Sequence, residues 1–475
     1  MAMTRSIVFP HFWLHCSMAI ALALSLPATS HARERASDAT GVPGIDEAQL
    51  SADFWLQQLE HPDALLLDSA LIQARNARLL QRDESMHDLA AFPAELPATR
   101  VRGWIQAYDA TLQRTLFHED GTPLTATDLQ QLRDAIAIDT LSDRQRTRFG
   151  LVVQRAPLRA VPSRLRAFSR AGETDIDRFQ ESAEFPGTPV VIAHRSRDGQ
   201  WLFVVSPRYA AWIPADAVAE GTRETVLGYV RATPYRIITD GKPRTVFTRE
   251  QPRVSELQLD MGVRIPLDAP PEGGIVNGQH AYTGWVLRLP VRQEDGRLAF
   301  AQALLPKSAG SSADYLPLTR ANLVRQAFKF LGERYGWGHS YNGRDCSGFV
   351  AEVYRSMGVM MPRNTGDQAR SPAFDHTLFD AASTRQQREA AVAALQTGDL
   401  IYIPGHVMMM LGRIDSRPYV IHDTNGGSLR TADGSRRSLG LNGVVVTPLE
   451  PMLYNDSDRY IDRITSIVRM RTAAP

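Results

Sequence analysis

The spacing of apolar residues divides the chain into a helical part, a part rich in short strands and a mixed part. Between residues 49 and 148 apolar positions recur every three or four residues, which predicts amphipathic helices. Ser51, Asp68 and Thr127 each precede such a stretch and are of the types that cap helices. We therefore expect a helical N-terminal region whose apolar faces pack against the domains that follow.

After this region the pattern changes to short apolar runs separated by turn residues, which is typical of β-strands. One set of runs occupies residues 149–222 and a second set occupies residues 223–305. Two small β-barrels in tandem account for both sets, and a single larger β-sandwich is the alternative. Residues 306–318 have the composition of a linker.

The last part of the chain, residues 319–475, mixes helical and strand patterns. Thr319 precedes one helical pattern, and Asp345 precedes another that starts at Cys346. Strand patterns then follow, at residues 398–403, 406–411 and 419–422. The sequence thus predicts a multidomain α+β protein with an N-terminal helical region, two small β-barrels and a C-terminal α+β domain.

Length and charge exclude several classes of protein. The chain has 475 residues, enough for about two to four domains, and its 43% hydrophobic and 22% charged content is ordinary for globular proteins. A largely disordered chain is therefore excluded. Lys and Arg number 53 against 52 Asp and Glu, so the chain lacks the basic excess of a dedicated nucleic-acid binder.

The first residues have the pattern of an export signal. Arg5 supplies a positive charge, residues 18–26 form a compact apolar run, and Ala32 ends a small-residue site, so we expect a signal peptide over residues 1–32. A membrane anchor is the alternative, but the run is shorter than the ~20 residues that a spanning helix needs. Residues 33–48 are expected to form a mobile leader. The mature protein would then be periplasmic or secreted.

Removal of that signal would leave a single cysteine. The chain has two, Cys16 and Cys346, so an exported form would keep one thiol without an intramolecular partner. The simplest interpretation of such a residue is a small buried apolar side chain. Cys346, however, is expected at the start of a helix, where free amides and the helix dipole favour the reactive thiolate. Its position makes Cys346 a candidate nucleophile.

Two histidines lie on strands that can pair as a hairpin. If Ile414 is the centre of the hairpin, His406 lies directly opposite His422, with Cβ atoms ~4.5–5.5 Å apart. A nucleophilic cysteine needs a base and a group that orients the base, and these histidines can supply both. A zinc site formed by Cys346, His339, His406 and His422 is an alternative, although it lacks the closely spaced ligand pair of most zinc sites.

The motifs around these residues resemble those of a known family. Landmarks similar to the Cys, His and His motifs of NlpC-type, papain-like cell-wall cysteine peptidases occur in RYGWGHSYNGRDCSGFVAEVYRSMGVMMPRN, TGDLIYIPGHVMMMLG and YVIHDTNG. The likeness covers roughly residues 320–450. The two upstream β modules resemble bacterial SH3-like barrels, and the whole order resembles the γ-D-glutamyl-diamino acid endopeptidases that trim peptidoglycan stem peptides.

This resemblance implies a role for each motif residue. Cys346 would be the nucleophile, His406 the general base and His422 the residue that orients His406. Tyr335 would help to hold the oxyanion, together with the backbone amide of Cys346. The residues implied in substrate binding are Asp345, Ser347, Tyr209, Trp337, Asn364 and Thr365.

Two of these substrate residues would meet the amino end of the peptide. Asp345 would recognise the free ammonium group of an N-terminal L-Ala, and Tyr209 of the first barrel would close the same end of the pocket. Two other positions depart from the family's pattern. Asn364 stands where relatives often have an acid, which bears on the diamino-acid pocket, and His339 stands where Gly is more usual.

The resemblance therefore predicts an exported cysteine endopeptidase. It would hydrolyse peptidoglycan stem peptides at the bond between γ-D-Glu and the diamino acid, in peptides with a free N-terminal L-Ala. Such acyl-transfer chemistry needs no cofactor or metal. The expected partners are stem peptides, with no nucleic acid and no stable membrane span, and we expect a monomer. The alternative is a non-catalytic peptidoglycan-binding protein that uses the tandem barrels.

Overall fold

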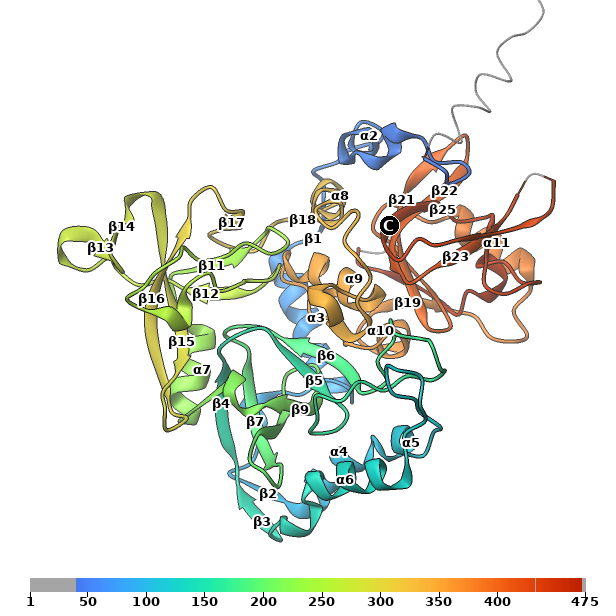
Figure 1. Cartoon of the computed structure of the whole chain (residues 1–475). Helices are drawn as coiled ribbons and strands as arrows, with labels where there is room; N and C mark the ends of the chain where they lie inside the picture. The colour runs from blue at the N-terminus through green and yellow to red at the C-terminus, as the bar shows by residue number, and fades with distance from the viewer. Residues whose placement is uncertain (1–39, 432, 472–475) are drawn as a thin grey trace, which may run out of the picture.

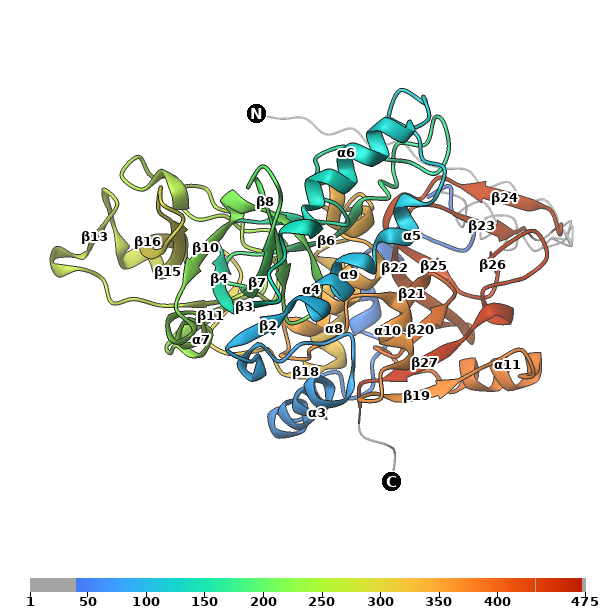
Figure 2. The same ribbon diagram turned by 90° about the horizontal axis from the view of Figure 1, so that it is seen from below.

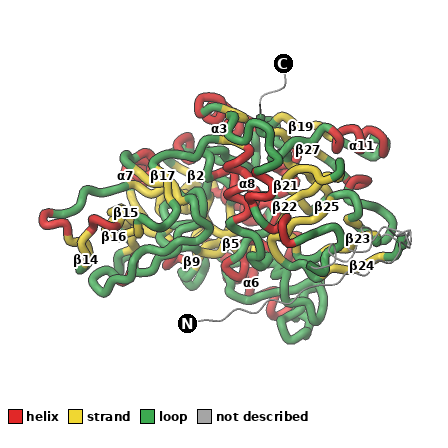
Figure 3. The backbone as a smooth tube through the Cα atoms, turned by 90° about the horizontal axis from the view of Figure 1, so that it is seen from above, coloured by secondary structure: helices red, strands yellow, loops and turns green. Residues whose placement is uncertain are grey.

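The computed structural model describes residues 40–431 and 433–471, and the predicted signal peptide lies outside them. Helices and strands are mixed along the described chain, which confirms the predicted α+β class (Figure 1). The molecule is elongated, with the domain after residue 222 at one end and the sheet of the C-terminal domain at the other (Figures 2 and 3). In the described residues no helix combines the length and the apolar character that crossing a bilayer would require.

The helices of the N-terminal region pack against two different domains. The first part joins the core of the C-terminal domain and contains α2 (Ala52–Leu56), β1 (Leu65–Leu67) and α3 (Ser69–Arg82). The second part packs on the first barrel and contains β2 (Glu95–Pro97), α4 (Ala98–Gln106), α5 (Asp109–Leu112), α6 (Ala126–Ile136) and β3 (Arg144–Arg146). This region therefore braces both neighbours, as its amphipathic pattern predicts.

Local capping explains where these helices begin. Ser51 and Asp68 accept backbone amides at the starts of α2 and α3, so both predicted caps are confirmed. The predicted cap at Thr127 is wrong, because α6 begins earlier, with Thr125 and Asp128 forming a reciprocal capping box. A capping box satisfies two free amides at once, which fixes the start of α6 at Thr125.

The end of the expected leader also packs on the C-terminal domain. Ile45 is buried in its core, and the Tyr419 hydroxyl donates a hydrogen bond to the Gly44 carbonyl at 3.0 Å. This stretch thus packs on a domain whose Tyr419 lies 375 residues further along the chain than Gly44. The expectation of mobility does not hold for this stretch.

The first β domain is one antiparallel sheet of seven strands in the order β10-β4-β7-β8-β9-β5-β6. The strands are β4 (Arg148–Val152), β5 (Ala156–Arg159), β6 (Gln180–Glu184), β7 (Pro189–Arg195), β8 (Trp201–Val205), β9 (Ala210–Pro214) and β10 (Val218–Gly221). Phe203 and Trp212 pair across β8 and β9 with ring centroids 5.4 Å apart and are fully buried. Such aromatic pairs stabilise neighbouring strands.

The second β domain follows α7 (Arg223–Arg231). A long hairpin pairs β15 (Gly284–Arg292) with β16 (Leu298–Pro306). The shorter strands are β11 (Tyr235–Ile238), β12 (Arg264–Pro266), β13 (Ile275–Val276), β14 (Gln279–His280) and β17 (Ser311–Ser312). Residues 306–318, expected as a linker, include β17, which pairs with β11. The domain boundaries at residues 148, 222 and 305 stay predictions.

The C-terminal domain places helices against a sheet of six strands in the order β19-β27-β20-β21-β22-β25. These strands are β19 (Asp375–Leu378), β20 (Leu400–Ile403), β21 (His406–Ile414), β22 (Arg417–Thr424), β25 (Gly443–Pro448) and β27 (Ser466–Arg469). The helices are α8 (Arg320–Phe328), α9 (Cys346–Arg355), α10 (Thr365–Arg370) and α11 (Arg385–Ala393). Helix α9 packs on β21 and β22 and brings Cys346 to the sheet.

Three further short strands form a small sheet beside this one, and another short strand precedes helix α8. The side sheet contains β23 (Gly427–Arg430), β24 (Arg436–Leu439) and β26 (Met452–Leu453). Strand β18 (Leu318–Thr319) pairs with β1 and ends where Thr319 caps α8, as predicted. The N-terminal region is thereby hydrogen-bonded to the start of the C-terminal domain.

The hairpin of β21 and β22 turns later along the chain than the sequence suggested. Ile414 pairs with Arg417, and the turn consists of Asp415 and Ser416 rather than being centred on Ile414. Asp415 and Ser416 have positive φ values of 48° and 66°. Positive φ at both central residues is the mark of a type I′ turn, whose twist matches that of paired strands.

This turn changes the predicted position of the two histidines. Met409 pairs with Ile421, and the register slips at Leu411, which forms a bulge. The ladder therefore places Met408, and not His406, directly opposite His422, so the predicted register is wrong. Because the difference is two residues, the side chains keep their faces, and the two histidines remain diagonal neighbours on one face.

Trp55 should hold the N-terminal region on the C-terminal domain. Its side chain is buried, donates a hydrogen bond to the Gln49 carbonyl at 2.9 Å, and lies 5.6 Å from the Tyr419 ring. We expect Trp55→Ala to lower the free energy of unfolding by roughly 3–5 kcal/mol, measured by urea denaturation. Leu71→Ala, at a position 45% exposed on α3, is the control and should change it little. Equal losses in both variants would contradict this assignment.

Candidate active site

Cys346 is the first residue of α9, and the residue before it caps the helix. The Asp345 carboxylate accepts the Gly348 backbone amide at 2.9 Å, which confirms the predicted cap. Cys346 is a free, buried thiol. The backbone on either side of His406 contacts the Cys346 sulfur. The Gly405 carbonyl lies 4.0 Å from this sulfur, and the Val407 amide hydrogen-bonds to it.

The two histidines are joined directly although they are not opposite each other. His406 Nε2 lies 2.7 Å from His422 Nδ1, and His422 Nε2 lies 3.0 Å from the Thr447 hydroxyl. This chain of bonds fixes the imidazole of His406 and leaves its Nδ1 free of His422. The structure thus places His406 against His422 and the backbone beside His406 against Cys346, while the catalytic roles of the three residues stay predictions. Thr447, on β25, is a partner that the sequence analysis missed.

Burial governs the protonation of the thiol and the imidazole. Burial and the nearby Asp345 raise the pKa of Cys346 to about 12, although the helix start was expected to favour the thiolate. Burial lowers the pKa of His406 to about 4 and that of His422 below its usual value. All three directions favour a neutral thiol beside a neutral imidazole, a state in which His406 can accept the thiol proton as the sulfur attacks.

The charge of Asp345 is paired within the protein. Arg363 Nη2 lies 2.7 Å from Asp345 Oδ2, and Arg363 Nη1 lies 3.1 Å from Oδ1. Burial alone would raise the pKa of Asp345, but Arg363, His339 and hydrogen bonds lower it to about 2. The Arg363 Nε also donates to the Ser182 hydroxyl of the first barrel at 2.7 Å. The sequence analysis missed Arg363, although a buried acid requires a cation beside it.

The contacts of His339 are with Arg363 of this pair and with Glu352. Its Nδ1 lies 3.1 Å from Arg363 Nη2, and its Nε2 lies 3.0 Å from the Glu352 carboxylate. Burial and the Arg363 charge lower the pKa of His339 to about 3, so its Nδ1 can accept a hydrogen bond from Arg363. Within residues 40–431 and 433–471 no three His, Cys, Asp or Glu side chains are grouped as metal ligands. The zinc alternative therefore has no support from the described residues.

A second buried cation, Arg344, ties the start of α9 to the second β domain. Its guanidinium lies 2.6 Å from Glu352, 2.7 Å from Glu333 and 3.2 Å from Asp260. The same Asp260 also pairs with Arg155 of the first barrel. Ion pairs of this kind keep their partners in one geometry, so they hold the loop before Cys346 against both β domains.

The remaining predicted substrate residues differ in how closely they approach the thiol. The Thr365 hydroxyl lies 3.8 Å from Cys346 Sγ, and the Ser347 hydroxyl accepts Arg363 Nη1 at 2.9 Å. Trp337 Nε1 donates to the Gln180 carbonyl of the first barrel at 3.0 Å. Asn364 is exposed, and its side-chain amide donates to the Asp367 carboxylate of α10 at 3.0 Å.

Two tyrosines belong to the site, Tyr335 near Cys346 and Tyr209 beside Glu181. Burial and the neighbouring Cys346 raise the pKa of Tyr335, so its hydroxyl stays protonated and can donate to an oxyanion. The Tyr209 hydroxyl donates to Glu181 at 2.6 Å, on the barrel side of Arg363. Glu181 is a further residue that the sequence analysis missed, because only folding brings β6 beside the catalytic loop. Burial raises its pKa to about 7.

Asp423 follows His422 on β22 and is the least satisfied acid near the thiol. It is fully buried, and both of its carboxylate oxygens have no hydrogen-bond partner among the described residues. Burial, followed by the charges of Asp345 and Glu333, raises its pKa well above the usual range. The surroundings of Asp423 therefore favour its neutral, protonated form over the carboxylate.

An α+β domain with a Cys, His and His arrangement of this kind is the mark of papain-like hydrolases. Residues 332–437 match the sequence profile of the NlpC/P60 family, and residues 165–214 match that of an SH3 domain of the SH3b1 type. Residues 332–437 therefore form an NlpC/P60 domain, preceded by a bacterial SH3 domain. The resemblance inferred from the motifs is confirmed.

Two curated proteins show similarity to parts of the chain. A γ-D-glutamyl-L-lysine dipeptidyl-peptidase of Bacillus cereus is 26% identical over 212 residues, which is 40% of this chain and 54% of that protein. Dipeptidyl-peptidase 6 of Lysinibacillus sphaericus is 29% identical over 110 residues, 23% of this chain and 34% of that protein. The chain thus spans about half the length of the first relative and a third of the second. Both names are those of peptidases, which supports the predicted enzyme class.

A solved structure resembles almost the whole described chain. An NlpC/P60 endopeptidase from Photobacterium damselae subsp. piscicida superposes with a TM-score of 0.71 at 15% identity, covering 88% of this chain and 97% of that chain. At this identity the likeness establishes the fold. It supports one shared arrangement of the N-terminal region, the β domains and the NlpC/P60 domain.

The Asp345–Arg363 pair should be essential to stability, because removing one partner leaves a buried, unpaired charge. We expect Asp345→Asn to lower the free energy of unfolding by roughly 3–5 kcal/mol. The double variant Asp345→Asn with Arg363→Gln should lose less than the sum of the two single variants, measured by urea denaturation. Additive losses would mean that the two side chains do not depend on each other.

The raised pKa of Asp423 predicts a characteristic pH dependence of stability. The folded protein holds the proton that the unfolded chain releases, so this carboxyl costs increasing stability as the pH rises above its unfolded value of about 4. Asp423→Asn removes that cost. Its stability relative to the wild type should therefore rise between pH 4 and pH 7 in thermal denaturation. The exposed Asp143→Asn is the control, and a difference that is flat with pH in Asp423→Asn would refute the assignment.

Proposed function

We propose that the protein is an exported cysteine endopeptidase that cuts peptidoglycan stem peptides between γ-D-Glu and the diamino acid. The observation that carries the proposal is the buried Cys346 thiol next to the hydrogen-bonded pair of His406 and His422, in an NlpC/P60 domain. The relative from Bacillus cereus, named for a γ-D-glutamyl-L-lysine bond, supports this choice of bond. We retain the predicted export, for which residues 1–32 are the candidate signal.

The proposed reaction proceeds through a thioester. The Cys346 sulfur attacks the carbonyl carbon of the γ-D-Glu amide, while His406 Nδ1 takes the thiol proton. The Cys346 backbone amide and the protonated Tyr335 hydroxyl hold the negative oxygen of the tetrahedral intermediate. When the C–N bond breaks, His406 gives the proton to the departing amine. Water, deprotonated by His406, then hydrolyses the thioester and frees the thiol.

His422 acts in this scheme by holding His406. Its Nδ1 contact at 2.7 Å and its Thr447 contact at 3.0 Å keep the base from rotating away from the sulfur. A neutral imidazole with a lowered pKa is ready to accept a proton near neutral pH. The thiol proton thus has a base in place before the substrate binds.

The barrel side of the site offers an acid for the amino end of the substrate. Both Asp345 oxygens already accept hydrogen bonds from Arg363 and from backbone amides. Among the described residues Glu181 accepts one side-chain hydrogen bond, from Tyr209, and burial raises its pKa to about 7, so a nearby ligand ammonium would favour its charged form. We therefore propose that Glu181 and Tyr209 bind the N-terminal ammonium of L-Ala, with Asp345 shaping the wall of the pocket.

The decisive experiment compares L-Ala-γ-D-Glu-diaminopimelate with its N-acetylated form. We expect the mature protein to release L-Ala-D-Glu from the free-amine peptide, detected by mass spectrometry, and to leave the acetylated peptide uncut. Cys346→Ala should abolish the release. Glu181→Gln should lower kcat/KM for the free-amine peptide by roughly 10–100-fold, since an ammonium–carboxylate bond contributes about 1.5–3 kcal/mol.

The outcomes of this comparison separate the steps of the proposal. Equal cleavage of both peptides would refute the role of the amino end and leave the catalytic triad standing. Release that persists in Cys346→Ala would refute the nucleophile. No cleavage of either peptide by the folded protein would refute the proposed bond and favour a wall-binding function of the β domains. Arg370→Gln, at an exposed position at the end of α10, serves as a control for nonspecific damage near the site.

A further inference from the structure

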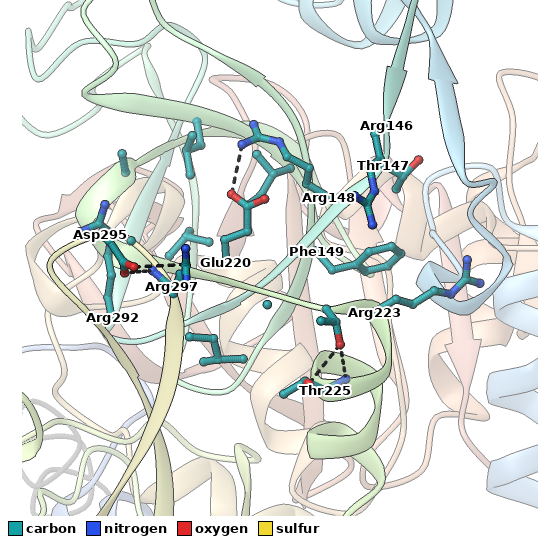
Figure 4. A pocket seen from close by; sticks show the side chains of 18 of the residues that line it. Arg146, Thr147, Arg148, Phe149, Glu220, Arg223, Thr225, Arg292, Asp295 and Arg297 are labelled. Atoms are coloured by element: carbon teal, nitrogen blue, oxygen red, sulfur yellow. Dashed lines mark hydrogen bonds and ion pairs between the residues drawn. The ribbon is translucent and has the colours of Figure 1, made fainter.

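A large cavity lies away from Cys346, between the two β domains. It has a volume of about 960 Å³. Its walls come from β3, β4, β7 and β10, from the start of α7 and from the tip of the β15–β16 hairpin. Glu220 on β10 bonds through its amide to the Gly296 carbonyl at 2.9 Å, which fastens the hairpin tip to the barrel. The cavity is therefore built by contacts between domains, and Figure 4 shows it from close by.

Arginine side chains dominate this cavity. Six of them line it, namely Arg146, Arg148, Arg195, Arg223, Arg292 and Arg297. Four acids also line it, namely Glu220, Glu224, Glu294 and Asp295. Arg148 pairs with Glu220 and Arg297 pairs with Asp295, each at 3.1 Å (Figure 4). The remaining four arginines face two acids, so the lining keeps an excess of positive charge.

Four of these arginines, Arg146, Arg195, Arg223 and Arg292, have no carboxylate within ion-pair distance among the residues that the structure describes. Arg292 contacts only the Gln293 carbonyl, at 3.4 Å, and its Nε is buried with no hydrogen-bond partner in the described chain. Arg195 contacts the Gly199 carbonyl at 3.5 Å. Arg146 is exposed and makes no side-chain hydrogen bond to the described residues. Burying a guanidinium donor without an acceptor costs stability, so Arg292 Nε is available to donate to a further partner.

The start of α7 adds to the positive potential. Residues 222–225 line the cavity, and Thr222 caps the helix by accepting the Thr225 amide at 3.2 Å. The helix is nine residues long, so its dipole places partial positive charge at this end. Arg223 is held there by hydrogen bonds to the Phe92 and Ala90 carbonyls and stands over the Phe149 ring.

The cavity and the catalytic thiol lie near opposite edges of the seven-stranded sheet of the first β domain. The strand order runs from β10 and β4, which line the cavity, to β5 and β6. Strand β6 contributes Ser182, which bonds to Arg363 beside Cys346. A ligand in the cavity would leave the path to Cys346 open, because the two sites share no lining residue.

We propose that this cavity is a binding site for a ligand that carries two or more phosphate or carboxylate groups. Arg292 lies at the tip of the β15–β16 hairpin, whereas Arg146 lies on β3 and Arg195 lies on β7 of the first β domain. One anionic group of the ligand would therefore meet the hairpin wall of the cavity, and another would meet the wall formed by β3 and β7. Guanidinium groups bind phosphate and carboxylate through paired N–H donors, which is the chemistry that this lining offers. The proposal is independent of the hydrolytic activity.

Isothermal titration calorimetry with two probes tests the proposal on the full mature chain. The probes are tripolyphosphate and citrate, which present several phosphates or several carboxylates. We expect saturable one-to-one binding of at least one probe at low ionic strength, weakened by added salt. The stronger probe identifies the class of oxyanion. Absence of saturable binding by both probes would overturn the proposal.

Charge variants decide whether binding occurs in this cavity. Arg146→Gln combined with Arg292→Gln should weaken the affinity at least tenfold. Glu294→Gln, which removes a negative charge from the same lining, should strengthen it. Arg231→Gln, at the far end of α7 and outside the cavity, is the matched control and should leave it unchanged. Should the double variant unfold, Arg195→Gln and Glu294→Gln still give opposite expected shifts. Unchanged affinity in the cavity variants would mean that the probes bind elsewhere.

Discussion

The buried pair of Asp345 and Arg363 is the interaction on which the site depends. Asp345 caps the helix that begins with the nucleophile, and Arg363 neutralises it while bonding to Ser182 of the first barrel. One ring nitrogen of His339 lies within hydrogen-bond distance of Arg363, and the other lies within hydrogen-bond distance of Glu352. Because a buried charge without its partner is costly, these residues can occupy only one arrangement. The position of Cys346 is therefore set by a network that spans two domains.

The same burial that orders the site also controls its protons. It raises the pKa of Cys346 and lowers that of His406, so the resting pair is neutral and the proton moves when the sulfur attacks. Burial likewise keeps Tyr335 protonated and favours the protonated form of Asp423. Glu181 is the acid whose pKa of about 7 leaves it ready to respond to a ligand charge. Burial in a low-polarity environment thus sets the protonation states on which both the proposed reaction and the proposed recognition of an amino group depend.

The first barrel connects two separate regions of the molecule. One edge of its sheet, at β6, forms a wall of the catalytic site, and the other edge, at β10, forms a wall of the arginine-rich cavity. The N-terminal helices pack on this barrel and on the C-terminal domain, which explains why residues from Ile45 to Ile136 belong to two hydrophobic cores. A barrel braced on several sides is a rigid support for residues that must keep their distances.

Local features were predictable from the sequence. The caps at Thr319 and Asp345, the helix that starts at Cys346, and the motifs with His406 and His422 all depend on residues a few positions apart. The register between β21 and β22 was not predictable, because the bulge at Leu411 depends on the packing of the whole sheet. Arg363, Glu181 and the arginine-rich cavity were missed for a related reason, since their partners lie far away along the chain. The sequence by itself determined which residues can do the chemistry, and the tertiary structure decided their partners, because burial and long-range pairing exist only in the folded chain.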